Sequence, residues 1–211
     1  MKSNNFIDIT MDNYYLNPYK FMQKNLNIFN KKTLSKNNIT NTNKFDKLII
    51  FKLIANNNID KLNDLIDNNT LLDINIQDKD GDTALHIAIF LSNYNACSIL
   101  IKHNANIFIR DKWGQTPLHR LCFALENKST IKIIDLINEN QLNNKDNIFN
   151  SFDKFNNTPL HLVIKYLIKN KIKLNKNILF ILHKLISLTN IKLVNNDGLS
   201  CKNLLTKLNI T

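Results

Sequence analysis

Apolar residues recur at helical spacing in two adjacent segments near the middle of the chain. The first segment contains Leu85, Ala88 and Ile89, and the second contains Ala96 and Leu100. Intervals of three and four residues place side chains on one face of an α-helix. The pattern therefore predicts two short helices, one directly after the other.

A polar turn precedes this pair of helices, and it is repeated along the chain. Four segments share it: residues 78–83, 111–116, 153–158 and 195–200. The fourth position of the turn is glycine in three copies and Asn156 in the other. Both residue types tolerate a left-handed backbone. We therefore predict the same tight turn in all four places.

Three of these turns run directly into a helix start. The segments Thr-Ala-Leu-His or Thr-Pro-Leu-His begin at Thr83, Thr116 and Thr158. A threonine hydroxyl can accept a hydrogen bond from a free amide of the first helical turn, which makes threonine a good N-cap. Pro117 and Pro159 then occupy the first helical position, where a missing N–H costs nothing. The repeating unit is therefore predicted to be turn, helix, helix.

At this point the chain resembles the ankyrin-repeat family, whose units have a period of 33 residues and a Thr-Pro-Leu-His core. Thr83 and Thr116 are 33 residues apart, and residues 78–110 match a whole unit. The resemblance implies an all-α solenoid of helix-turn-helix units joined by β-turn or hairpin tips. The Lys-, Asn- and Ile-rich composition is similar to that of small ankyrin proteins from AT-rich genomes, including pathogen effectors and viral proteins.

We expect about five units, of which the first and last are divergent caps. Each cap would cover an apolar face that a central repeat leaves open. Residues 1–44 are rich in Asn and Lys, and we expect them to be either disordered or a short capping helix. The expected ankyrin domain is 45–211, divided into 45–77, 78–110, 111–152, 153–194 and 195–211.

The third and fourth units are longer than the 33-residue period. Thr116 and Thr158 are 42 residues apart, as are Thr158 and Ser200. In the third unit we place the extra residues near 126–129 and 141–147. In the fourth unit they fall near 167–176, where they would extend the first helix.

The formal net charge of +11 raises the alternative of a basic surface that binds nucleic acid or another acidic partner. Arg110 and Arg120 are the only arginines in the sequence, and lysine is abundant throughout. A compositional bias of this kind would scatter lysines over every solvated face. Nucleic acid is therefore an unlikely partner.

Three cysteines set far apart among apolar neighbours, Cys97, Cys122 and Cys201, suit reduced core thiols better than disulfides. No secretory signal pattern or membrane-spanning window is visible in the sequence. We therefore expect a cytoplasmic protein, in the host cytoplasm if it is an effector, with no membrane contact.

The sequence offers little for catalysis, and we expect neither an enzyme nor a cofactor nor a metal. The family resemblance implies that His86, His119 and His161 form hydrogen bonds to the turn and to neighbouring repeats. Cys122 lies three residues after His119, but no third group is present to orient such a pair. The cysteine and histidine spacings match no zinc motif. Isolated glycines exclude phosphate-binding loops.

The family resemblance implies that a partner binds the concave face of the solenoid, where it contacts the turn tips and the exposed ends of the first helices. At the tips these positions are Lys79, Asp80, Asp82, Lys112, Trp113, Gln115, Lys154, Phe155 and Asn157, and on the helices they are Phe90, Phe123, Lys165 and Tyr166. Five of these residues are aromatic. They could form a continuous stripe that binds a partner, or they could pack against adjacent turns. We expect a monomer that binds another protein.

Overall fold

The structure is a computed structural model that describes residues 49–69, 71–141 and 146–210. The chain divides between Asp46 and Lys47 into two units, and every described residue belongs to the second. The expectation of disorder or a capping helix for residues 1–44 therefore falls outside the described residues. The same is true of the central part of the insert expected at 141–147.

Helices account for all the named elements of the described residues. The expected all-α class is therefore confirmed, with isolated antiparallel bridges at two tips, between Gln77 and Thr83 and between Val194 and Ser200. The elements are α3 (Ile49–Ala55), α4 (Ile59–Asn68), α5 (Ala84–Phe90), α6 (Tyr94–Lys102), the 3-10 helix η1 (Pro117–Phe123), α7 (Ser129–Gln141), the 3-10 helix η2 (Ile148–Asn150), α8 (Pro159–Lys169), α9 (Lys176–Leu188) and α10 (Cys201–Thr206).

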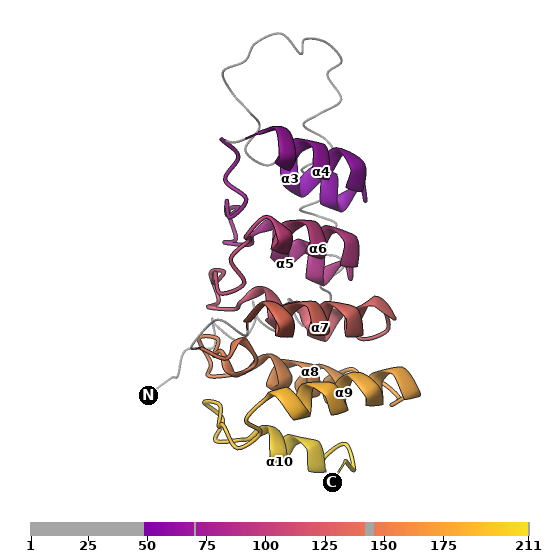
Figure 1. The fold of residues 1–211 in the computed structure, drawn as a ribbon. Coiled ribbons are helices and arrows are strands. Elements are labelled where there is room, and N and C mark those ends of the chain that lie inside the picture. Colours follow the sequence, from indigo (N-terminus) through magenta and orange to yellow (C-terminus); the bar gives the residue numbers. More distant parts are fainter. Residues whose placement is uncertain (1–48, 70, 142–145, 211) are drawn as a thin grey trace. The chain divides into compact units, whose positions relative to one another are not determined.

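The helices stack in two layers (Figure 1). The first helices of successive pairs, α3, α5, η1, α8 and α10, pack against one another in chain order. The second helices, α4, α6, α7 and α9, form the other layer in the same order. Each pair therefore contacts mainly the pair before it and the pair after it, which is the arrangement of a helix-turn-helix solenoid.

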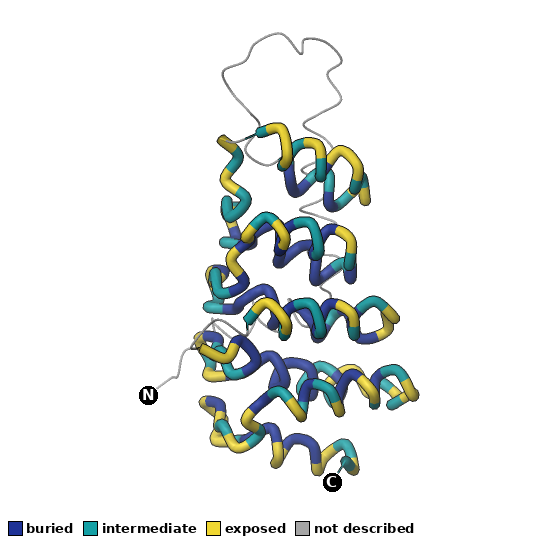
Figure 2. The backbone as a smooth tube through the Cα atoms, viewed as in Figure 1, coloured by how far each residue is buried: buried dark blue, intermediate teal, exposed yellow. Residues whose placement is uncertain are grey.

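The core lies between and within these two layers (Figure 2). All seven residues of α5 are buried, because this helix has neighbours on several sides. Phe51 of α3 and Phe149 of η2 are among the largest fully buried side chains. Burial of a side chain of this size stabilises the fold by about 1.5–3 kcal/mol. The described part of the chain is thus held together mainly by apolar contacts between the helices of successive repeats.

The longer repeats depart from the shorter one in different ways. In the third repeat the first helix is the 3-10 helix η1, and residues 124–128 separate it from α7. In the fourth repeat α8 has 11 residues where α5 has seven. The prediction that 167–176 extends the first helix is therefore correct only as far as Lys169. The rest forms a turn, and α9 begins at Lys176.

Candidate protein-binding surface

Each tip turn is shaped by the first side chain of its motif. In the third repeat, Oδ1 of Asp111 accepts hydrogen bonds from the backbone N–H groups of Trp113 and Gln115, both at 2.8 Å. The N–H of Asp111 in turn donates to the carbonyl oxygen of Gln115 at 2.9 Å. Asp78, Asp153 and Asn195 make the same pair of side-chain contacts in the other tips. The predicted turn is confirmed in all four places.

Successive tips are joined to each other through their backbones. The N–H of Lys112 donates to the carbonyl of Asp80, and the N–H of Lys154 donates to the carbonyl of Trp113, each at 3.0 Å. A third bond of the same length links Asn196 to the carbonyl of Phe155. The chain approaches itself so closely here that a Cβ on Gly81 would lie 2.9 Å from the nitrogen of Lys112. The register between tips is therefore fixed.

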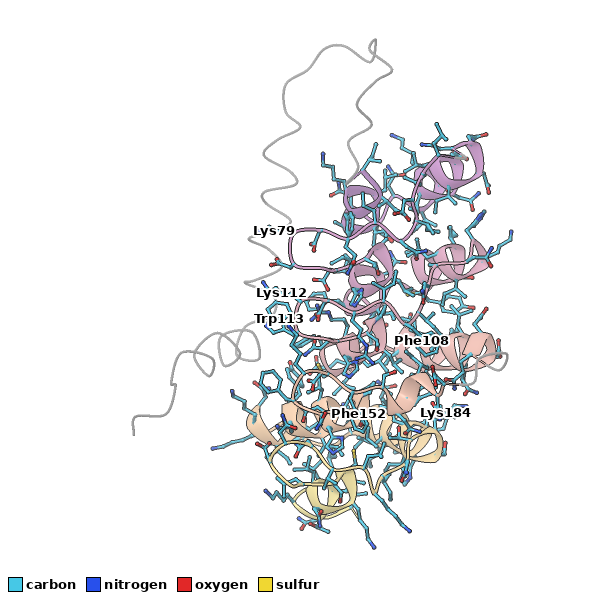
Figure 3. All side chains as sticks on the ribbon, turned by 90° about the vertical axis from the view of Figure 1, so that its left-hand side faces the viewer. Lys79, Phe108, Lys112, Trp113, Phe152 and Lys184 are labelled. Atoms are coloured by element: carbon cyan, nitrogen blue, oxygen red, sulfur yellow. The ribbon has the colours of Figure 1, made fainter. Side chains whose placement is uncertain are left out.

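Several side chains point outward from this linked row of tips. Lys79, Lys112 and Lys154 are exposed, and Trp113 and Phe155 are half-buried. The ammonium group of Lys112 lies 4.1 Å from the centroid of the Trp113 ring, within the range of a cation–π contact. Figure 3 shows Lys79, Lys112 and Trp113 along the same edge, with Phe108 and Lys184 away from it.

Three of the five predicted stripe residues form a row across the first helices. The rings of Phe90 and Phe123 are 5.4 Å apart and tilted, and those of Phe123 and Tyr166 are 5.5 Å apart and edge-on. Both distances lie in the range preferred by interacting aromatic pairs. One ring from each of the second, third and fourth repeats therefore contributes to the row.

The repeated histidines connect each repeat to the next one. Nδ1 of His86, His119 and His161 accepts from the backbone N–H of the preceding threonine, at 3.0 to 3.2 Å. Nε2 must then carry the proton, and it lies 3.1 Å from a carbonyl oxygen of the next tip in every case. Burial lowers the pKa of His86 to about 4 and that of His119 to about 3. The predicted scaffold role of these neutral side chains is confirmed.

Comparison with known families decides what this repeat is. Residues 50–146 match the family model of ankyrin repeats in three copies. The chain belongs to the ankyrin-repeat family. The fourth ankyrin repeat lies beyond the matched residues, and there Thr158 and His161 form the same capping box as Thr83 and His86.

The chain is similar to short parts of several longer proteins. It is 30% identical over 128 residues to the human transient receptor potential cation channel subfamily A member 1, which is 61% of this chain and 11% of the channel. It is 38% identical over 63 residues to a putative ankyrin repeat protein of Rickettsia felis, covering 30% of this chain and 21% of that protein. It is 44% identical over 48 residues to the inhibitor of Bruton tyrosine kinase of Xenopus laevis, covering 22% of this chain and 4% of that protein. Ankyrin repeats are generally protein–protein interaction modules, and their fold is non-catalytic.

Four of the predicted tip contacts are buried and turned into the ankyrin scaffold, so their expected exposure is corrected. Asp82, Gln115 and Asn157 directly precede the N-cap threonine, where the chain turns inward, and they are 4%, 1% and 2% exposed. The amide of Asn157, for example, donates to Asp153 and accepts from Asn195. The carboxylate of Asp80 is also buried, and it accepts from the ammonium group of Lys112.

Two of the residues predicted on the first helices also interact with other parts of the protein and are less exposed than expected. Phe90 is only 7% exposed, because it lies against the Phe123 ring within the layer of first helices. Lys165 is half-buried, and its ammonium group lies 2.9 Å from the carboxylate of Asp197 in the next tip. This contact lowers the pKa of Asp197. Phe123 and Tyr166 are half-buried and retain part of their surface.

The sequence analysis missed a buried ionic cluster centred on Arg120. Its guanidinium donates to the carboxylates of Asp82 and Asp111, the second at 2.7 Å, and to Oε1 of Gln115 at 3.2 Å. Burial raises the pKa of Asp111 to about 7, although the backbone N–H groups of Gln115 and Trp113 act in the opposite direction by donating to its carboxylate. One signal was available in the sequence: a scarce arginine stands where the neighbouring repeats have Ile87 and Leu162.

The three cysteines are free and buried, as predicted. Burial raises the pKa of Cys122 and of Cys201 to about 12. Sγ of Cys201 lies 3.1 Å from Nδ1 of His161, but its thiol stays protonated at that pKa and is not a poised nucleophile. In the part of the chain that the structure describes, no helix is long and apolar enough to cross a membrane.

Proposed function

We propose that this protein is a non-catalytic adaptor or inhibitor that binds another protein through the outward face of its ankyrin tips. The contact surface consists of the exposed or half-buried predicted residues, namely Lys79, Lys112, Trp113, Lys154, Phe155, Phe123, Lys165 and Tyr166. Asp82, Gln115, Asn157, Asp80 and Phe90 are left out because they are buried.

The observation that carries this proposal is the fixed register of the tips. The bonds from Lys112 to Asp80 and from Lys154 to Trp113 use only backbone atoms. The side chains of Trp113 and Phe155 are therefore presented on a rigid support, which reduces the entropy lost when a partner binds. Aromatic residues, tryptophan in particular, are also enriched in binding hot spots.

We further propose that the protein acts as a monomer in the cytoplasm. Support comes from Cys97, Cys122 and Cys201, which are free thiols rather than disulfides, as is usual in a reducing compartment.

The test replaces the two tip rings that the proposal depends on. The double variant Trp113→Ala with Phe155→Ala should leave the circular dichroism spectrum unchanged. It should lower the affinity for a captured partner by at least about tenfold, because hot-spot truncations cost about 2 kcal/mol or more. Phe108→Ala is the matched control, since this half-buried ring lies away from the tip edge in Figure 3. The affinity of each variant is measured by titration with the purified partner.

Equal affinity of the double variant and the wild type would contradict the proposed surface. A greater loss with Phe108→Ala than with the double variant would place the binding site on the opposite side of the tip loops.

A further inference from the structure

The fourth repeat has a high net positive charge, because its lysines are not accompanied by carboxylates. Residues 154–196 contain eight lysines and no aspartate or glutamate. Residues 60–82 of the first and second repeats, in contrast, contain seven aspartates and two lysines. Compositional bias alone would spread charge evenly over the repeats, so this difference in net charge departs from the even scatter expected from the sequence.

Three of these lysines lie close together in sequence at the turn between α8 and α9. Lys171, Lys173 and Lys176 are all exposed. Among the described residues, ion pairs tie Lys112, Lys165 and Lys184 to aspartates in neighbouring repeats, whereas these three lysines have no carboxylate within ion-pairing distance. Their charges are therefore directed at the solvent around one short turn.

An exposed aromatic ring lies beside these lysines. Phe180 is 61% exposed, and it lies one helical turn after Lys176 on the same face of α9. Two half-buried apolar residues, Ile172 and Leu174, alternate with the lysines in the turn. The turn therefore combines cations with apolar side chains that contact water.

This turn projects beyond the corresponding turn of the second repeat. Because α8 is four residues longer than α5, it extends about 6 Å further along its axis. Figure 1 shows the α8–α9 turn reaching past the α5–α6 turn on the side opposite the tips. The α8–α9 turn therefore lies further from the tips than the turn of the second repeat does.

We propose that the α8–α9 turn docks the protein peripherally on an anionic lipid surface, with Lys171, Lys173 and Lys176 against the headgroups and Phe180 in the interfacial layer. Clustered lysines are attracted to acidic lipids, and an apolar side chain adds to this attraction when it enters the headgroup boundary. The surface is distinct from the ankyrin tips and does not depend on the proposed tip function. It revises the expectation of no membrane contact, which rested on the absence of a spanning segment.

A nucleic acid fits this turn less well. The cations are all lysines, without the planar guanidinium groups that bind phosphate in two-point contacts. They also lie on a projecting turn, whereas single strands are held in grooves that follow the backbone and stack several bases on aromatic rings. Phe180 is the one exposed aromatic ring among the exposed large hydrophobic residues of the described chain.

The test measures binding of the full-length chain to phosphatidylcholine vesicles with and without phosphatidylserine, by cosedimentation at low and high salt. The wild type should bind only the vesicles with phosphatidylserine, and less at high salt. Replacing Lys171, Lys173 and Lys176 together with Gln should weaken binding about 100-fold, because each lysine contributes a factor of about five. Phe180→Ser should weaken it about tenfold.

The matched control replaces three exposed lysines of other repeats, Lys61, Lys102 and Lys202, with Gln. This control should retain nearly all of the binding, because it removes the same number of charges but leaves Lys171, Lys173, Lys176 and Phe180 in place. The proposal is overturned if the wild type does not bind phosphatidylserine, or if the two triple variants lose binding equally. It is also overturned if a single-stranded oligonucleotide binds more tightly than the vesicles and Phe180→Ser has no effect on either.

Discussion

The second and third repeats have the same tip and the same capping box, but their first helices differ. α5 is an α-helix whose inward side chains other than His86 are apolar, including Ile87. At the equivalent position η1 is a 3-10 helix with Arg120 buried in a cluster of carboxylates. In a 3-10 helix residues three apart lie above each other, so Arg120 and Phe123 share one side of η1. Two repeats with the same tip and capping box can therefore be stabilised differently, one by an apolar side chain and the other by a buried ionic cluster.

The largest expected effect comes from breaking the ionic cluster. Arg120→Ala should lower the free energy of unfolding by about 3–5 kcal/mol, because it leaves two buried carboxylates without their cation. Urea denaturation followed by circular dichroism measures the change.

The repeats themselves supply the compensating replacement for this cluster. At the junction of the fourth and fifth repeats, Asn157 is equivalent to Asp82, Asn195 to Asp111, and Leu204 to Arg120. The triple variant Asp82→Asn, Asp111→Asn and Arg120→Leu should therefore regain most of the stability lost in Arg120→Ala. A triple variant as unstable as Arg120→Ala would show that the cluster does more than balance charge.

A smaller effect on stability is expected from alanine substitutions in the tip glycines. It should differ between Gly81, which the next tip covers, and Gly198, which no other part of the described chain approaches. Gly81 and Gly198 have φ angles of 82° and 71°, but only a Cβ on Gly81 would collide with the next tip. Gly198→Ala should cost about 1–2 kcal/mol for its left-handed backbone. Gly81→Ala should cost about 1–3 kcal/mol more, because the added methyl group forces the tips apart. Equal shifts in thermal melting would contradict the close approach of the tips.

The effect that is smallest at neutral pH, and grows only as the pH falls, is a pH dependence from the neutral histidines. The folded pKa of His119, about 3, lies below the ordinary value of 6.5, so the unfolded chain takes up the proton first as the pH falls. Its stabilisation is complete above pH 6.5 and is lost as the pH decreases towards 3. The loss is about 1.4 kcal/mol per pH unit.

The last ankyrin unit provides the matched variant for this test. Asn203 takes the place of the histidine there, and its Oδ1 accepts from the N–H of Ser200 at 3.1 Å. His119→Asn should therefore flatten the dependence of unfolding free energy on pH between 6.5 and 4, while the carboxylates contribute equally to both proteins. Parallel curves for variant and wild type would rule out His119 as a source of the pH dependence.

The parts of the fold that could be predicted depend on neighbouring residues. The tip turn needs only Asp111 and the glycine three positions later, and the capping box needs only Thr116 and His119. Such signals remain visible in a single sequence because they lie within one short segment. The pairing of helices and the solenoid class follow from their repetition.

The parts that could not be predicted depend on residues far apart in the chain. Arg120 and Asp82 are 38 positions apart, and no local pattern connects them. Gln115 and Asn157 were expected to be exposed because they lie at the turn tips, but burial is decided by the inward turn of the chain before the N-cap. The lysine-rich α8–α9 turn was missed because charge was considered for the chain as a whole rather than repeat by repeat.

The backbone bonds between tips have a consequence for how the sequence of this protein can change over generations. Each hydrogen bond between tips, such as the one from Lys154 to Trp113, joins main-chain atoms that every residue other than proline possesses. Positions such as 79, 113 and 155 can therefore accumulate substitutions at little cost to folding. The outward side chains of the tips can therefore change, and with them the binding specificity, while the backbone that supports them stays the same.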